Sequence, residues 1–340
     1  MACGVEGTTG PRRFISSLPV GLTMTDSQVD HHVAATDATV NSCWDNSLDP
    51  VVTVDPGSVV QFECLDVHSG RLGPESTASD LAALDTDSVH PLTGPVAVEG
   101  ARPGDALVVE LLDLEHHGWG FTGVLPGEVG LGLLADEFPD PAYHYWELDG
   151  DVGRFVDGIE VPLDPFPGNL GVAPEAPGEH STIPPRRVGG NLDVKHLTAG
   201  AAVHFPVAVD GALFSIGDCH AAQGDGEVCG NGIEAPMTVT CRFDVYEDAD
   251  LDAPRFSTTG PFSAGDAAGP VVGTMGVEDD LRAAARSAVR SMLDHLVAER
   301  GLTRTEAYVL CSAAVDLKIN EVVNAPNWVV SAYLPECIFP

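Results

Sequence analysis

Residues Val203 to Val245 read VHFPVAVDGALFSIGDCHAAQGDGEVCGNGIEAPMTVTCRFDV, and they contain the clearest strand signals of this 340-residue chain. Two apolar runs flank Asp210 and Gly211, a residue pair that favours tight two-residue turns because both positions take a positive φ. This pattern predicts a β-hairpin over residues 203–216. After a polar loop, apolar and polar residues alternate from Ile233 to Val245, which predicts a strand with one buried face.

Strand signals continue from this stretch toward the N-terminus. Short extended runs separated by Pro, Gly and Asp fill residues 51–245, a pattern typical of an all-β sandwich or barrel. Residues 136–190 are rich in Pro, Gly and aromatic residues but lack periodicity, so we expect long ordered loops there. The body of the chain is therefore predicted to be mainly β.

Helical periodicity is found only near the C-terminus. It predicts a helix over residues 278–300 that ends at Gly301, and Thr303 with Glu306 forms a capping box for a second, short helix. The run NWVVSAYLP at residues 327–335 then predicts a return to strand. A stretch rich in Gly, Pro and Ser, residues 257–276, is expected to connect this α+β portion to the body. The apolar stripe of the first helix consists of Leu281, Ala285, Ala288, Val289, Met292 and Leu296.

We expect three parts along the chain: an extension at residues 1–23, a β-rich body at 24–250 that holds the site, and an α+β portion at 251–340. The extension is basic, unlike the rest, and we expect it to be disordered or to result from an over-extended start, with Met24 as the true first residue. A degenerate twin-arginine export signal is less favoured, because the apolar stretch is short and no A-x-A site follows. The expected location is the cytoplasm.

The chain is strongly acidic, with 51 Asp and Glu against 16 Lys and Arg and a formal net charge of -35. This argues against nucleic acid as a partner, because phosphate binding depends on a basic surface. At about 1 M salt the Debye length falls to roughly 3 Å and self-repulsion is largely screened, so we expect adaptation to a salty cytoplasm. No run approaches the roughly 18 apolar residues of a membrane span. Eight scattered cysteines without a CxxC pair fit reduced core residues.

Several motifs resemble the acetamidase/formamidase family. GDCHAAQGDGEVCGNGIE, residues 217–234, is similar to the family signature G-D-x-H-x-x-Q-G-D-G-E followed by an Ile-Glu or Val-Glu pair. The resemblance implies a jelly-roll-like β-sandwich or barrel with a smaller C-terminal α+β portion, assembly as a homo-oligomer, and hydrolysis of short linear amides to a carboxylate and ammonia. Further blocks occur in the family order: GPVAVEGARPGDALVVELLDLE (94–115), WGFTGVLPG (119–127), GNLGVAP (168–174), GGNLD (189–193) and EAYVLCSAAVDLKINEVVN (306–324).

Three residues of the signature are the predicted catalytic and metal-binding residues: Asp218, His220 and Glu227. Asp218 and His220 are two apart on a predicted strand, so their side chains share a face while Cys219 points the other way. Glu227 lies in a Gly-flanked loop that can bring its carboxylate back over the same strand end. We expect a divalent metal ion, zinc or calcium, to activate water here, with Glu227 as third ligand or general base.

Three further residues are candidates for binding the substrate: Gln223, Asp193 and Glu234. Gln223 could contact the substrate amide or simply hydrogen-bond its loop. Asp193 follows two glycines in GGNLD, a pattern that is also a common turn, and Glu234 could belong to the solvated face of a strand. Asp225, between two glycines, fits a turn residue as well as a site residue.

Two other functions stay open. A metal-free hydrolase would use Glu227 as base, with a carboxylate or Cys219 forming a covalent intermediate. A non-catalytic binding module is the second, because three acids and a histidine in one loop also suit calcium, and jelly-roll folds bind ligands without chemistry. Ammonia release from an amide would separate the enzymes from the binding module.

Overall fold

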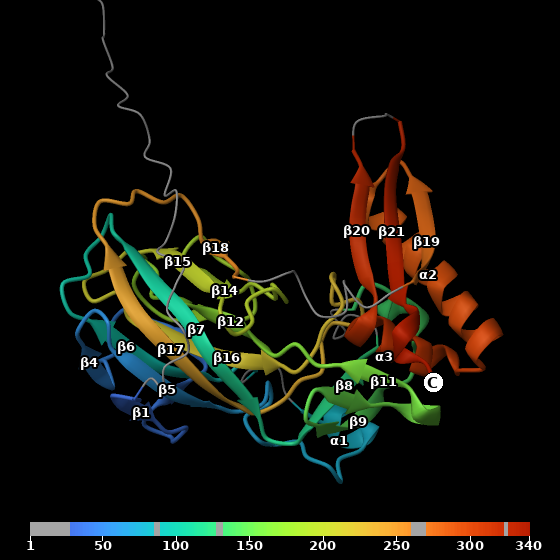
Figure 1. Cartoon of the computed structure of the whole chain (residues 1–340), viewed down its shortest axis with the longest axis horizontal. Coiled ribbons are helices and arrows are strands. Elements are labelled where there is room, and N and C mark those ends of the chain that lie inside the picture. Colours follow the sequence, from blue (N-terminus) through green and yellow to red (C-terminus); the bar gives the residue numbers. More distant parts are fainter. Residues whose placement is uncertain (1–27, 85–88, 127–131, 260–269, 323–325) are drawn as a thin grey trace, which may run out of the picture.

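The computed structural model describes residues 28–84, 89–126, 132–259, 270–322 and 326–340 (Figure 1). The predicted extension at residues 1–23 lies outside them. Two large sheets form the body. The first sheet has the order β1 (His31–Val33), β5 (Val59–Cys64), β17 (Met237–Tyr246), β7 (Ala106–His116), β15 (Ala202–Pro206) and β18 (Arg255–Ser257). The second has the order β14 (Gly189–Asn191), β12 (Phe166–Val172), β16 (Phe214–His220), β6 (Leu92–Val98) and β2 (Val40–Asn41), and β4 (Val52–Val54) also pairs with β6.

The two sheets pack face to face through aromatic side chains. Phe214 of β16 contacts Phe62 of β5 and Phe243 of β17, with ring centroids 5.9 Å and 5.1 Å apart. All three rings are fully buried, so the core of the body lies between the sheets. The predicted mainly β class is confirmed, whereas a jelly-roll connection of the strands stays a prediction.

The predicted hairpin over residues 203–216 is wrong. β15 pairs with β7 and β18, whereas β16 pairs with β12 and β6, so the two runs lie in opposite sheets. Three successive residues between them, Gly211, Ala212 and Leu213, have left-handed backbone with φ of 76°, 62° and 59°. The Asp-Gly pair therefore begins a crossing from one sheet to the other, which its turn preference alone does not distinguish from a tight hairpin.

The alternation predicted over residues 233–245 is confirmed only from Met237, where β17 begins. Met237, Val239, Cys241 and Phe243 are fully buried, and Asp244 on the opposite face is exposed. β17 pairs with β5 on one side and β7 on the other, which places it inside the first sheet. A central strand with one face on the core has this period of two.

The long loops predicted over residues 136–190 are wrong. This region contains β9 (Ala142–Asp149), β10 (Val152–Arg154), β11 (Glu160–Pro162) and β12, and the first three form a four-stranded sheet with β8 (Trp119–Val124). In β9, buried Trp146 and Leu148 alternate with exposed Tyr145 and Glu147. Because this alternation covers only a few residues between Pro- and Gly-rich neighbours, its periodic signal is weak.

Smaller elements in the chain are α1 (Ala78–Ala82), β3 (Cys43–Trp44), β13 (His180–Ser181) and the 3-10 turns η1 (Ala135–Glu137), η2 (Val156–Gly158) and η4 (Glu336–Ile338).

The C-terminal helices are present, with one shifted boundary. α2 covers Leu281–Arg300 and begins after Asp280, whose side chain accepts a hydrogen bond from the Ala283 N–H. Leu281, predicted on the apolar stripe, is exposed in this first turn. α3 covers Arg304–Ala314 behind the predicted capping box, and α1 shows that helix is not confined to the C-terminus. The buried residues of α2 are Ala284, Ala288, Val289, Met292, Leu293 and Leu296.

A three-stranded sheet of β19 (Val271–Glu278), β21 (Trp328–Pro335) and β20 (Asp316–Glu321) projects from the body beside α2 (Figure 1). The predicted connection at residues 257–276 is therefore wrong from Val271 onward, and residues 260–269 lie outside the described part. A Cβ at Gly276 would lie 1.9 Å from the Ala284 carbonyl oxygen, so this glycine allows α2 to lie directly on β19.

α3 packs against the loop that contains the family signature. The Tyr308 hydroxyl donates to the Val228 carbonyl, and Ser312 Oγ accepts from the Cys229 N–H at 3.0 Å. The Gly224 N–H donates to the Ser312 carbonyl at 2.8 Å. These contacts cross the expected boundary between residues 250 and 251, which itself stays a prediction. Among the described residues, no helix is long and apolar enough to cross a membrane.

Candidate active site

His220, the last residue of β16, lies at the centre of the site and is only 1% exposed. Its ring packs edge-on against Phe166 of β12, with centroids 5.0 Å apart. Nδ1 lies 2.7 Å from Oε1 of Gln223, and the Gln223 amide nitrogen donates to the Asp193 carbonyl at 3.1 Å. Because this assigns Oε1 as an acceptor, Nδ1 of His220 carries a proton and Nε2 faces the site.

Three carboxylates surround Nε2 of His220. The closest is Glu234, with Oε1 at 3.1 Å, followed by Asp218 Oδ1 at 3.7 Å and Glu227 Oε1 at 4.0 Å. A fourth, Asp193, has an oxygen within 4.8 Å of the His220 and Glu227 ligand atoms. The structure places Asp218, His220 and Glu227 together, and the roles expected for them stay predictions.

Left-handed backbone positions several of these side chains. Asp193, Asp218 and Glu227 have φ of 49°, 51° and 45°, and His90 nearby has a φ of 54°. Such values are uncommon outside glycine, and they concentrate at functional sites where the surrounding structure stabilises them. Asp218 therefore reaches the site from a distorted strand end, not from the regular strand that the sequence predicted.

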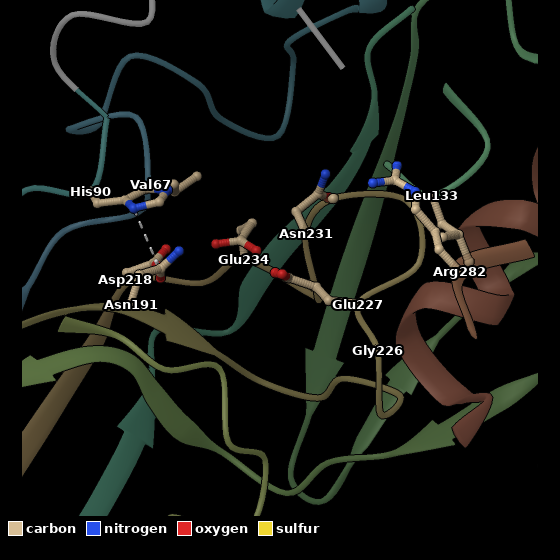
Figure 2. A pocket seen from close by; sticks show the side chains of 11 residues that line it. Val67, His90, Leu133, Asn191, Asp218, Gly226, Glu227, Asn231, Glu234 and Arg282 are labelled. Carbon is tan, nitrogen blue, oxygen red and sulfur yellow. Dashed lines mark ion pairs between the residues drawn. The ribbon is translucent and has the colours of Figure 1, made fainter. Parts of the chain in front are cut away.

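The cluster lies at one side of a cavity of about 270 Å³. Figure 2 shows Asp218, Glu234 and Glu227 in a row, with His90 at one end and Arg282 of α2 at the other. His90 Nδ1 is 3.9 Å from Asp218 Oδ2. Glu227 is the most accessible of the three carboxylates, with 23% of its side chain exposed against 4% for Asp218 and 1% for Glu234.

Burial and mutual repulsion perturb the acids of the cluster. Burial, together with the charges of Asp218 and Glu234, raises the pKa of Asp193 to about 7 despite the opposing effect of His220. Burial and the neighbouring Asp193 likewise raise the pKa of Glu227 well above its usual range. For Asp218 burial acts in the same direction, but His90 and His220 outweigh it and hold its pKa well below the usual value. Perturbed acids in a cavity are typical of functional sites.

The cluster has the composition of a cation site. Four carboxylates share one central imidazole, and buried charges in proteins are normally paired or bound to a metal ion. Three of the buried carboxylate oxygens lack a hydrogen-bond partner among the described residues: Asp193 Oδ1, Asp218 Oδ1 and Glu234 Oε2. Two sets offer ligand atoms within 4.8 Å of one another, Asp193–His220–Glu227 and Asp218–His220–Glu234. The donor atoms thus fit a divalent metal ion.

Two other residues considered from the sequence, Asp225 and Cys219, do not belong to the carboxylate cluster. Asp225 lies outside the cluster, where its N–H donates to Asp316 Oδ1 at 2.9 Å and its carbonyl accepts from the Leu317 N–H at 2.8 Å. Cys219 is 1% exposed, and a hydrogen bond with Cys64 together with burial raises its pKa well above the usual value. A thiol in this environment is a poor nucleophile.

Two residues beside the cavity were not found from the sequence: His90 and Arg282. His90 precedes β6, and the pairing of Leu92 with Gly217 brings it next to Asp218. Arg282 arrives through the packing of α2. Both placements depend on contacts between distant segments, and the only local signal is a His-Pro pair before an apolar run.

Comparison with known proteins identifies the family of this chain. The family model described as "Acetamidase/Formamidase family" matches residues 26–180 and 176–340. The chain belongs to the acetamidase/formamidase family. The resemblance seen in the signature and its flanking blocks is therefore confirmed over nearly the whole described chain.

Individual family relatives are similar at a moderate level. A formamidase from Methylophilus methylotrophus is 32% identical over 248 residues, 57% of this chain and 61% of the relative. An acetamidase from Mycolicibacterium smegmatis is 31% identical over 265 residues, 59% of this chain and 65% of the relative. The matches thus span less than two thirds of these curated relatives. A solved γ-lactamase from Delftia acidovorans has a TM-score of 0.85 and 28% identity, and covers 91% of this chain and 93% of its own.

Proposed function

We propose that this chain hydrolyses short linear amides of the formamide and acetamide class to a carboxylate and ammonia. Family membership supports the reaction, and the curated relatives named formamidase and acetamidase support the substrate class. The observation that carries the proposal is the convergence of four carboxylates on His220 beside a cavity.

We assign the ligands of a divalent metal ion to Asp218, His220 and Glu234. These three are the most deeply buried members of the cluster, and their ligand atoms lie within 4.8 Å of one another. An imidazole with carboxylates suits zinc, whereas calcium takes six to eight oxygen ligands. A zinc ion bound there would lower the pKa of a water molecule and polarise the amide carbonyl. Gln223 holds the ring of His220 in the orientation that this binding needs.

Glu227, predicted as third ligand or base, is assigned the role of base. Its carboxylate is the most accessible of the three around Nε2 and faces the cavity. It accepts a proton from water while the C–O bond forms and delivers that proton to the departing nitrogen as the C–N bond breaks. The products are the carboxylate and ammonia, so one carboxyl group performs both proton transfers.

Ammonia release from formamide and acetamide in 2 M KCl tests this proposal. The protein is assayed as purified, after chelation, and after addition of zinc or calcium to the chelated protein. We expect activity that is lost on chelation and restored by zinc. Undiminished activity in metal-free protein would contradict the metal assignment, and no ammonia from any preparation would contradict the hydrolysis and favour a binding module.

A further inference from the structure

Arg282 places a positive charge at one end of an otherwise acidic cavity. Its side chain extends from α2 toward Asn231, on the side of the cavity away from His90 (Figure 2). The chain has only 16 basic residues against 51 acidic ones, and Arg282 is an exposed residue that lines this cavity. The cavity therefore has an acidic reaction centre and a cationic end.

The other arginines of the two C-terminal helices have carboxylate partners. Arg286 binds Asp136 with Nη2 and Oδ1 2.6 Å apart, and Arg290 binds Glu137 at 2.5 Å. Arg300 and Arg304 likewise form ion pairs, at 2.9 Å and 3.0 Å. Among the described residues, Arg282 has no such acceptor, although it is surrounded by an acidic protein. Its guanidinium is available to bind an anion.

The position of Arg282 does not favour the helix itself. It is the second residue of α2, and a cation in the first turn of a helix opposes the helix dipole. The first turn holds no acidic residue, and the N-cap residue Asp280 uses its side chain to accept from the Ala283 N–H. Helix stability therefore gives no reason for an arginine here, whereas the cavity beside it does.

The cavity is larger than acetamide requires. A cavity of about 150 Å³ accommodates benzene, with six heavy atoms, so by the same ratio 270 Å³ accommodates about eleven. Acetamide has four heavy atoms. An amide bound at the carboxylate cluster thus leaves room for several more atoms toward Arg282.

We propose that Arg282 binds a carboxylate of the substrate, so that the substrates of this chain are amides with a carboxylate a few atoms from the amide group. The inference rests on the proposed amide hydrolysis. A guanidinium matches a carboxylate through two parallel hydrogen bonds, which orient as well as attract. With succinamate, water supplies the oxygen of the new carboxylate, the C–N bond breaks, and the products are succinate and ammonium. Acetamide occupies only the reaction centre.

Succinamate and succinamide form a matched pair for the test, because they have the same number of heavy atoms and differ in the distal charge. We expect kcat/KM to be at least about tenfold higher for succinamate, since a hydrogen-bonded charge contributes about 1.5–3 kcal/mol. Arg282→Gln should reduce this ratio to about one, and Arg282→Lys should retain part of it. Arg154→Gln, at an exposed ion pair on β10, serves as the control and should keep the full ratio.

Acetamide turnover and direct binding separate the two levels of the proposal. If acetamide is hydrolysed but wild type does not prefer succinamate, or Arg282→Gln keeps the preference, the assignment of Arg282 is wrong while amide hydrolysis stands. If no amide is hydrolysed, calorimetry with succinamate decides. Binding to wild type that is lost in Arg282→Gln supports the anion site, whereas equal binding or no binding to both overturns it.

Discussion

Nδ1 of His220 lies 2.7 Å from Oε1 of Gln223, and this contact directs the other ring nitrogen toward the carboxylates of the cavity. Both ends of the Gln223 amide are occupied, because its nitrogen donates to the Asp193 carbonyl. Gln223 as a whole is only 6% exposed. We therefore assign Gln223 a positioning role, in place of the substrate contact that the sequence suggested.

Gln223→Leu should lower both zinc affinity and kcat/KM for acetamide by about 10–100-fold, because partners that orient a metal-binding histidine typically contribute that much. The measurements are zinc content after dialysis against a competing chelator and steady-state ammonia release. Gln61→Leu, at a half-buried position on β5, is the matched control. Unchanged zinc affinity in Gln223→Leu would show that the ring is held by its packing alone.

Local sequence was enough to predict that three side chains of the candidate site lie together. Asp218, His220 and Glu227 lie within ten residues of one another, and two features bring them together: a strand end and a glycine-rich turn. The prediction of β17 also depended on local sequence alone, because side chains alternate with a period of two whichever strands lie beside it. These features depend on short-range chemistry that a single sequence displays.

The misplaced elements depend on partners far away in the chain. Asp210-Gly211 indicates a turn, but whether β15 and β16 then pair or separate is decided by β7 and β12. His90 and Arg282 reach the cavity through strand pairing and helix packing, respectively. Hydrophobic periodicity does not indicate either contact with the cavity, so the sequence around His90 and Arg282 could not identify them as cavity residues.

His144 of β9 should make the protein less stable in mild acid. Its ring packs against Trp146 and Phe155, and burial lowers its pKa from 6.5 to about 4. A histidine with a depressed pKa in the folded state stabilises it above pH 6.5, and this stabilisation is lost as the pH falls toward 4, because only the unfolded chain takes up the proton.

His144→Phe removes this proton uptake. Relative to wild type, the free energy of unfolding of His144→Phe should rise by up to about 3 kcal/mol between pH 7 and pH 4. Denaturant unfolding at constant KCl measures it, and His117→Phe at an exposed position gives the baseline. If the difference in the free energy of unfolding between His144→Phe and wild type stays constant with pH, His144 is protonated in the folded protein.

Lys195 and Asp316 form a buried ion pair that supports the signature loop. Asp316 Oδ1 accepts from Lys195 Nζ and from the Asp225 N–H, two residues before Glu227. Lys195→Met should lower the free energy of unfolding by about 3–5 kcal/mol, because the buried carboxylate then keeps only the distant, exposed Lys318 as a cationic partner. Lys195→Met combined with Asp316→Asn should recover most of this loss, since the asparagine still accepts from Asp225.

The control for this pair is Lys318→Met. Lys318 Nζ is 4.0 Å from the other Asp316 oxygen, and its side chain is 47% exposed. Lys318→Met should therefore lower the free energy of unfolding by only about 0–1 kcal/mol. Chemical denaturation gives all three values. If the double variant is as unstable as Lys195→Met, the unpaired carboxylate is not the cause, and the lost packing of the lysine chain is.

Gly168 of β12 lies directly behind the carboxylate cluster. A Cβ at this position would lie 2.6 Å from Asp193 Oδ1, 2.8 Å from the Asp218 carbonyl oxygen and 3.2 Å from His220 Cε1. Contacts below 3.0 Å force a shift, and the atoms that must move include the Asp193 carboxylate and the ring that holds Nε2 in place.

Gly168→Ala should therefore reduce kcat/KM for acetamide by about 100-fold, because a displacement near 1 Å at a reaction centre has an effect of that size. The cost in stability should be smaller, about 1–3 kcal/mol from overpacking, so the variant still folds. Gly73→Ala is the matched control, since its Cβ would meet no atom within 4 Å. Thermal unfolding and ammonia release are measured on both variants. Full activity in a folded Gly168→Ala protein would contradict a role for this cluster in catalysis, because the substitution cannot leave its geometry unchanged.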